Sequence, residues 1–149
     1  MIAIVIHWER AAWALRKDAL RKIQKWHTFA MKPFGVTRLL IVDLDGNNPL
    51  WSDAEMQVTN HDTLEDALKQ LPGYTPVYVE AGLENSINLE SYIHPTVDTV
   101  YIFGSDYSTG KMDPGDADVI EIEQPTGLHI MWVPIPIGIV LHDRYVKSL

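Results

Sequence analysis

Apolar residues along this chain gather into short continuous runs, instead of alternating with polar ones. Runs rich in Val, Ile and Tyr are typical of strands that are buried on both faces of a parallel sheet. The pattern predicts five such strands, over residues 2–6, 38–43, 76–80, 99–103 and 118–122. Residues 50–60 have no clean period, and we assign them neither to a strand nor to a helix.

Between these runs, apolar positions recur at spacings of three and four, which predicts helices. The longest covers residues 9–31, with an apolar stripe of Ala12, Leu15, Ala19, Ile23, Trp26 and Ala30. A second covers 63–71 and opens on the capping-box spacing of Asp62-Thr63-Leu64-Glu65. A third covers 134–146 and is expected to turn Ile135, Ile139, Leu141 and Tyr145 toward the sheet, and one helical turn is expected near 89–92.

Strands that alternate with helices predict an α/β fold with a mostly parallel sheet of five to six strands and helices on both faces. The 149 residues suit a single domain, 1–149. The absence of cysteine removes disulfides and thiolate metal sites. No apolar run approaches the ~20 residues of a membrane span, so we expect a soluble cytoplasmic protein.

Charge is distributed unevenly along the chain. The net charge of −8 argues against a nucleic-acid partner, yet residues 1–38 carry eight basic and two acidic side chains, a net of +6, and the other 111 residues carry −14. Lys17, Arg21 and Lys25 recur every four residues on the first helix. This stripe has two interpretations: a solvated helix face, or a surface that binds RNA phosphates, which would relieve its self-repulsion.

The fourth strand ends at Gly104, and a loop of small and acidic residues follows. Ligands of open α/β sheets bind outside the carboxyl ends of the strands. Gly104 and Gly110 let the main chain turn sharply and let a ligand approach it closely. We therefore predict that this loop is the floor of a ligand site.

Three blocks of sequence also resemble a known family. They are Phe34-Gly35-Val36 with Leu39-Leu40-Ile41-Val42, then Phe103-Gly104-Ser105-Asp106, and then Ile120-Glu121-Ile122-Glu123-Gln124 with Met131 and the helix to His142-Asp143. In order and spacing they resemble the SPOUT methyltransferases, and among them the small SpoU-like 2′-O-methyltransferases of tRNA. The resemblance implies an α/β trefoil knot, a homodimer packed on the C-terminal helix, and S-adenosylmethionine as cofactor.

The candidate cofactor-binding residues lie beyond the third, fourth and fifth predicted strands. They are Leu83, Gly104, Ser105, Ile122, Gln124 and Met131. Core packing is an equally good explanation of Ile122 and Met131. Gly104 has the strongest case, because a glycine at a strand end before a polar turn implies a backbone requirement.

The residues for the chemical step are less well matched to the family. Ile23, Lys25 and Phe29 stand where the first block has Asn, Gly and a catalytic Arg, and Ile130-Met131-Trp132 stands where the third has Ser-Leu/Met-Asn. The candidates for catalysis are Arg21 and Lys25, on the corresponding helix, and His129, beside the acceptor site that the resemblance implies. The other histidines have no metal-ligand spacing and are interpreted as surface or capping residues. No metal site is predicted.

Two functions remain open from the sequence. The first is an RNA methyltransferase that uses S-adenosylmethionine, with RNA bound by the basic first helix. The second is a catalytically silent relative that binds the cofactor, a nucleotide or a partner protein. The Gly104 loop and the basic helix favour the first, and the missing Arg and Asn favour the second.

Overall fold

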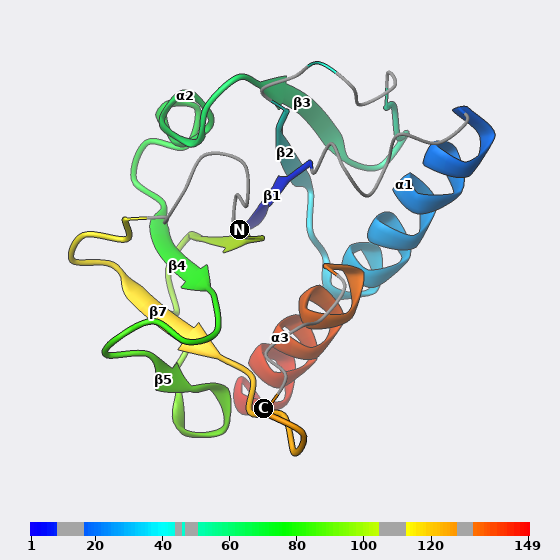
Figure 1. Cartoon of the computed structure of the whole chain (residues 1–149). Coiled ribbons are helices and arrows are strands. Elements are labelled where there is room, and N and C mark those ends of the chain that lie inside the picture. The colour runs from blue at the N-terminus through cyan, green and yellow to red at the C-terminus, as the bar shows by residue number, and fades with distance from the viewer. Residues whose placement is uncertain (9–16, 44–45, 47–50, 105–112, 128–132) are drawn as a thin grey trace.

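The computed structural model describes residues 1–8, 17–43, 46, 51–104, 113–127 and 133–149 (Figure 1). Its seven strands are β1 (Ile2–His7), β2 (Arg38–Val42), β3 (Gln57–His61), β4 (Thr75–Val79), β5 (Ile87–Asn88), β6 (Thr99–Phe103) and β7 (Asp118–Glu121). They form one sheet in the order β3-β2-β1-β6-β4-β7-β5, and every pairing is parallel. All carboxyl ends of these strands therefore point to the same edge.

The described residues also form three α-helices and two short 3₁₀ helices, of which α3 follows the last strand. They are α1 (Lys17–Met31), α2 (Leu64–Lys69), α3 (Pro134–Lys147), η1 (Lys32–Phe34) and η2 (Leu89–Ser91). Thr63 caps α2 by accepting a hydrogen bond from the Asp66 backbone N–H at 3.1 Å. None of the helices in the described residues is long and apolar enough to cross a bilayer.

The α/β class and the five predicted strands are confirmed, each within one or two residues of its predicted ends. The predicted strand number is wrong, because the described sheet also contains β3 and β5. β3 (QVTNH) is a half-exposed edge strand with one aliphatic residue, so it lacks the apolar run of a central strand. β5 has only two residues, which is too short for any period.

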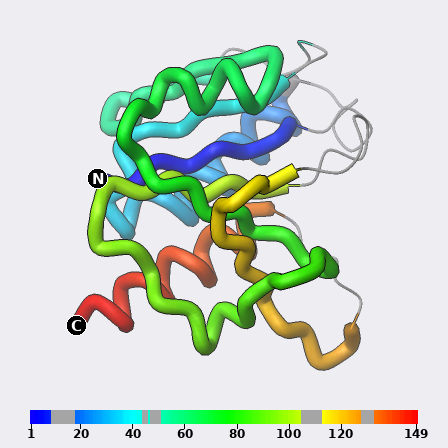
Figure 2. The backbone as a smooth tube through the Cα atoms, turned by 90° about the vertical axis from the view of Figure 1, so that its left-hand side faces the viewer, coloured from blue at the N-terminus to red at the C-terminus, as the bar shows by residue number. Residues whose placement is uncertain are grey.

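Side chains of the central strands alternate between two cores, one on each face of the sheet. Ile4 and Ile6 of β1 pack in the larger core with α1 and α3, whereas Ala3 and Val5 pack in the smaller core with α2. This arrangement explains the continuous apolar runs, since both faces of each strand are buried. In Figure 2, α2 (green) lies above the sheet and α3 (red) lies below it.

The predicted inward faces of the two long helices are partly wrong. Trp26 of α1 is 47% exposed, and Ile135, Ile139 and Tyr145 of α3 are 50%, 38% and 55% exposed. Of the four residues expected to face the sheet from α3, only Leu141 is buried. The buried face of α1 instead contains Leu20, Ile23, Gln24, His27, Thr28 and Met31, and that of α3 contains Pro134, Ile137, Val140 and Leu141.

Two predictions about the fold fall on residues outside those described. The first eight residues of the predicted helix 9–31 are among them. The threading of the C-terminal helix depends on the paths of 105–112 and 128–132, which the structure does not describe. The trefoil knot therefore stays a prediction.

Candidate functional site

The carboxyl edge of the sheet brings together the ends of β1, β4, β6 and β7. Phe103, the last residue of β6, is paired with Ile6 of β1 on one side and with Val79 of β4 on the other. Val79 is in turn paired with Ile120 of β7. Residues that directly follow paired strands are consequently neighbours, although those after β1 and β6 are 96 positions apart in the sequence.

Gly104 occupies the middle of this edge in a conformation that suits glycine. Its φ is +88°, a region that residues with a Cβ rarely adopt. A Cβ built at this position would lie 3.4 Å from the Cβ of His7. The Nδ1–H of His7 donates a hydrogen bond to the Phe103 carbonyl at 3.2 Å, which joins the ends of β1 and β6. The backbone requirement predicted for Gly104 is thus present in the structure.

Glu80 is an acidic residue of this edge that the sequence did not single out. It directly follows β4, and its backbone N–H donates to the Ile120 carbonyl of β7 at 3.0 Å. Partial burial raises the pKa of its carboxyl group. A carboxyl group with a raised pKa beside a strand end is a feature of many functional sites. In the sequence, the feature that could have indicated Glu80 is its position at the end of an apolar run.

The remaining predicted cofactor residues lie on the two faces of this edge. Leu83, in the segment after β4, packs against the core on the α2 face, whereas Ile122, directly after β7, packs against the core on the α3 face. Gln124 is half-buried, and its backbone carbonyl accepts a hydrogen bond from the Gly127 backbone N–H at 2.9 Å. Ser105 and Met131 lie outside the described residues.

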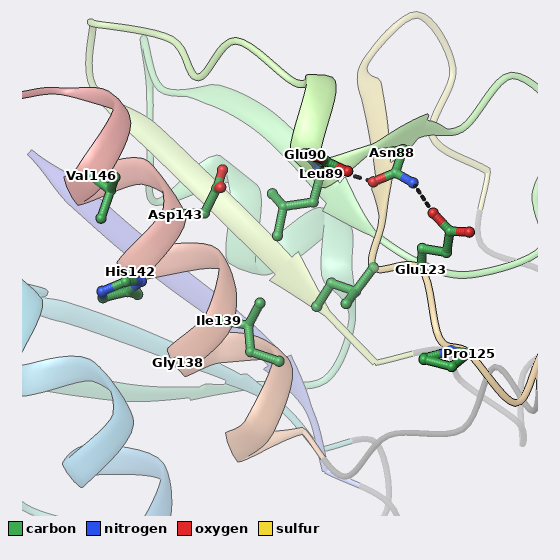
Figure 3. A pocket seen from close by; sticks show the side chains of 11 residues that line it. Asn88, Leu89, Glu90, Glu123, Pro125, Gly138, Ile139, His142, Asp143 and Val146 are labelled. Carbon is green, nitrogen blue, oxygen red and sulfur yellow. Dashed lines mark hydrogen bonds between the residues drawn. The ribbon is translucent and has the colours of Figure 1, made fainter.

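A groove of about 870 Å³ runs along α3, and Ile122 is among the residues that line it (Figure 3). Three segments form its walls: Asn88–Glu90 around η2, the segment after β7, and the outer face of α3. Besides Ile122 and residues 88–90, its lining consists of Glu123, Pro125, Gly138, Ile139, His142, Asp143 and Val146. The surface is apolar in its interior and carries carboxylates at its margins.

A lysine near the end of α3 fixes two of these walls to each other. The Nζ of Lys147 donates to the carbonyls of Leu89, Glu90 and Tyr92 at 2.6, 2.9 and 3.1 Å. The same Nζ forms an ion pair with Asp143 at 2.8 Å. Lys147 therefore holds η2 against α3.

Two of the catalytic candidates lie on α1, apart from the cofactor candidates. Arg21 and Lys25 are both exposed. Because α1 runs back from the carboxyl edge toward the start of β2, Arg21 is the nearer of the two to that edge. His129 lies outside the described residues.

The interpretation of the histidines as surface or capping residues is wrong for His27 and His94. Both side chains are buried, with exposed fractions of 3% and 9%. Burial lowers the pKa of His27 to about 4 and also lowers the pKa of His94. Within the described ranges, no three His, Asp or Glu side chains are arranged to hold a metal ion.

Comparisons with known proteins identify the fold but not the family. No protein-family model matches this sequence, and no curated protein matches it significantly. Among solved structures, the A. aeolicus TrmH/SpoU tRNA modifying enzyme superposes with a TM-score of 0.74 at 14% identity, over 99% of this chain and 75% of the enzyme.

Two further structures give the same result. An AdoMet-bound rRNA methyltransferase from Sinorhizobium meliloti has a TM-score of 0.64 at 12% identity, over 99% of this chain and 57% of its own. A structure described as concerning 2-OH methylation of C/U34 on tRNA has a TM-score of 0.63 at 13% identity, over 99% and 95%. At these identities the likeness establishes the fold: this chain folds like the TrmH/SpoU RNA-modifying enzymes.

Proposed function

We propose that this chain is an RNA methyltransferase of the SPOUT family, which transfers a methyl group from S-adenosylmethionine to a ribose 2′-hydroxyl of tRNA or rRNA. The observation that carries the proposal is the superposition of 99% of the chain on a tRNA modifying enzyme. The left-handed conformation of Gly104 at the end of β6 supports the proposal.

The proposed cofactor site is the carboxyl edge of the sheet. The positive φ of Gly104 and its close approach to His7 leave main-chain groups, instead of a side chain, facing this edge. Leu83, Ile122 and Gln124, together with Ser105 and Met131, are proposed to surround the nucleoside part. When bound, S-adenosylmethionine supplies an electrophilic methyl group on a sulfonium, and the carboxyl group of Glu80 lies at the same edge to attract that positive charge.

RNA is proposed to bind along α1, whose exposed cations face solvent. Lys32 is not part of this surface, because its Nζ forms ion pairs with Asp53 at 2.6 Å and Glu55 at 3.4 Å. Hydrogen bonding to Asp53 raises the pKa of Lys32, as expected for a cation with its own partner. Arg21 and Lys25 are the exposed cations that we assign to the phosphates.

A catalytically silent binder of S-adenosylmethionine, of a nucleotide or of a protein is the second candidate. One observation favours it: Ile23 and Phe29 replace polar residues of the family's first block, and they are respectively buried in the core and 68% exposed. Arg21 and Lys25 are exposed cationic side chains, and a cation is a poor general base. They would orient the acceptor.

Calorimetric titration with S-adenosylmethionine and with its demethylated product tests the cofactor. Binding tighter than millimolar supports the methyltransferase and the silent binder of S-adenosylmethionine, whereas weaker binding of both compounds refutes these two and leaves only a silent binder of a nucleotide or a protein. Transfer of a tritiated methyl group to bulk tRNA and rRNA then separates the two. Alkaline resistance of the labelled dinucleotide would locate the methyl on the 2′-oxygen, and labelled bases would contradict ribose methylation.

A further inference from the structure

His7 lies at the carboxyl edge of the sheet, and its side chain has no part in the function proposed above. It is the last residue of β1 and is half-buried. A Cβ built at Gly104 would lie 3.4 Å from the His7 Cβ and 3.6 Å from its backbone nitrogen. Because Gly104 has no side chain, a ligand that approaches the main chain there also comes close to His7.

One hydrogen bond determines which ring nitrogen of His7 carries the proton. Nδ1 lies 3.2 Å from the backbone carbonyl oxygen of Phe103. A carbonyl oxygen can only accept, so Nδ1 is the donor. In the neutral imidazole the lone pair is then on the other nitrogen, Nε2. The atom that joins His7 to β6 is therefore not the atom that can take up a proton, and the ring is oriented as a base.

Methyl transfer to a ribose hydroxyl is assisted by a group that takes up the hydroxyl proton. Arg21 and Lys25 are cations and poor bases, and Glu80 is assigned above to the positive charge of the sulfonium. Glu80 follows β4 and His7 ends β1, and β6 with Gly104 lies between these two strands. A ligand at the end of β6 therefore has the carboxyl group on one side and the imidazole on the other.

We propose that Nε2 of His7 is the general base for the ribose 2′-hydroxyl. This inference rests on the proposed function, because it needs S-adenosylmethionine and an RNA ribose at this edge. The 2′-oxygen forms a bond to the methyl carbon, the bond from that carbon to sulfur breaks, and its electron pair stays on the sulfur. The hydroxyl proton passes to Nε2, and the resulting imidazolium later releases it to water. The products are a 2′-O-methylated ribose and a neutral thioether.

Methyl transfer to bulk tRNA and rRNA by full-length variants separates this role from a structural one. His7→Asn places an amide nitrogen near the position of Nδ1, so the bond to the Phe103 carbonyl can persist while Nε2 is removed. We expect kcat to fall by about a hundredfold or more, whereas KM for RNA and the calorimetric Kd for S-adenosylmethionine stay near the wild-type values. Free imidazole should restore part of the lost rate in His7→Ala, because it supplies a base where the ring was removed.

Nitrogen NMR of isotope-labelled wild-type protein gives a second readout, which needs neither turnover nor a variant that folds. At a pH where the ring is neutral, His7 should be protonated on Nδ1 and unprotonated on Nε2. Addition of S-adenosylmethionine should move the Nε2 signal of His7 and leave the signals of His61 in place.

His61→Asn is the matched control. His61 ends β3 in register with Val42, which is itself in register with His7, so it has the same position two strands away. Its substitution should leave the rate unchanged. A wild-type rate in His7→Asn, an equal loss in His61→Asn, or a proton on Nε2 of neutral His7 overturns the role of His7 alone. A wild-type chain that binds no S-adenosylmethionine, or binds it and transfers no methyl group, refutes the methyltransferase and this inference together.

Discussion

His94 is held between Tyr101 at the centre of the sheet and Asp143 of α3, with its Nε2 2.9 Å from the Asp143 carboxylate and its Nδ1 2.6 Å from the Tyr101 hydroxyl. Arg144 can only donate, and it donates to the Tyr101 oxygen at 3.0 Å. The Nε2–H of His94 donates to the Asp143 carboxylate, and burial lowers the pKa of His94, so its Nδ1 carries no proton and accepts a hydrogen bond from the Tyr101 hydroxyl. The chain of hydrogen bonds fixes His94 as a neutral ring of defined tautomer.

This chain of hydrogen bonds joins α3 to the sheet, so we expect Tyr101→Phe to lower the free energy of unfolding by about 1–3 kcal/mol. The substitution leaves Nδ1 of His94 buried without a donor and removes an acceptor from Arg144. Urea unfolding at pH 7.5 measures the loss. Tyr145→Phe is the control, since Tyr145 is 55% exposed on the same helix and should change stability little. If both variants lowered the free energy of unfolding equally, the stabilising role assigned to the Tyr101 hydroxyl would be contradicted.

Two buried histidines should make the protein acid-sensitive. Burial lowers the pKa of His27 to about 4 and also lowers that of His94, both below the usual 6.5. Between the lowered and the usual pKa, the unfolded chain binds a proton that the folded protein does not. Stability is therefore complete above about pH 6.5, is lost as the pH falls, and levels off near pH 4 for His27.

Urea unfolding between pH 4.5 and 7.5 checks this dependence. Each histidine contributes at most about 1.4 kcal/mol per pH unit, and His27→Gln should remove its share of the slope. The cause of this pH dependence is burial and not surface charge. Salt on the order of 0.5 M screens interactions between surface charges, so the slope of stability against pH should persist at that concentration. A slope unchanged in His27→Gln would show that other groups cause it.

The central part of the fold follows directly from the sequence, whereas its margins do not. β1 and β6 are predictable because both faces of each strand are buried, which produces unbroken runs such as IAIVI. β3 pairs with β2 by backbone hydrogen bonds that are independent of side-chain hydrophobicity, so QVTNH gives little signal. Whether such a segment forms a strand depends on its pairing with a neighbouring strand in the folded protein.

Helix faces were harder to predict because two surfaces of each helix are apolar. Ile137 and Val140 of α3 face the core, while Ile135 and Ile139 face outward. The composition of the helix alone therefore does not tell which of its faces is buried. On α1, Gln24 and Thr28 are buried and Trp26 is half exposed, which reverses the usual preference. The apolar side chains of Trp26, Ile135, Ile139 and Tyr145, which the pattern assigned to the core, therefore lie on the surface.

At the candidate site, the residue that the sequence predicted was Gly104, whose position requires a backbone conformation that favours glycine. Gly104 stood out because a strand ended there, and its φ of +88° agrees. The other residues of this edge are His7 of β1 and Glu80, which directly follows β4; both are far from Gly104 in sequence, and their proximity arises only from the order β1-β6-β4. A single sequence contains no signal for that order.

Substituting Gly104 should affect both stability and ligand binding. We expect Gly104→Ala to cost about 1–2 kcal/mol of unfolding free energy, because alanine is strained at this φ, and to weaken S-adenosylmethionine binding by about tenfold. Gly73→Ala is the matched control: its φ is +82°, and nothing lies within 4 Å of its Cβ position. It should destabilise the protein similarly but leave binding unchanged. Equal loss of affinity in both variants would argue against a cofactor site at Gly104.

The exposed cations of α1 should determine how RNA binding depends on salt. We expect Arg21→Glu and Lys25→Glu each to weaken tRNA binding and to reduce the slope of log K against log salt by roughly 0.7–0.9, because each removes one phosphate contact. Fluorescence anisotropy across a salt series measures both quantities. Lys69→Glu on α2 is the control, since Lys69 is exposed on the opposite face of the sheet and is paired with Glu65 at 3.2 Å. If wild-type binding hardly changes with salt, or if Lys69→Glu has an equal effect, the α1 stripe is solvated surface and RNA binds elsewhere.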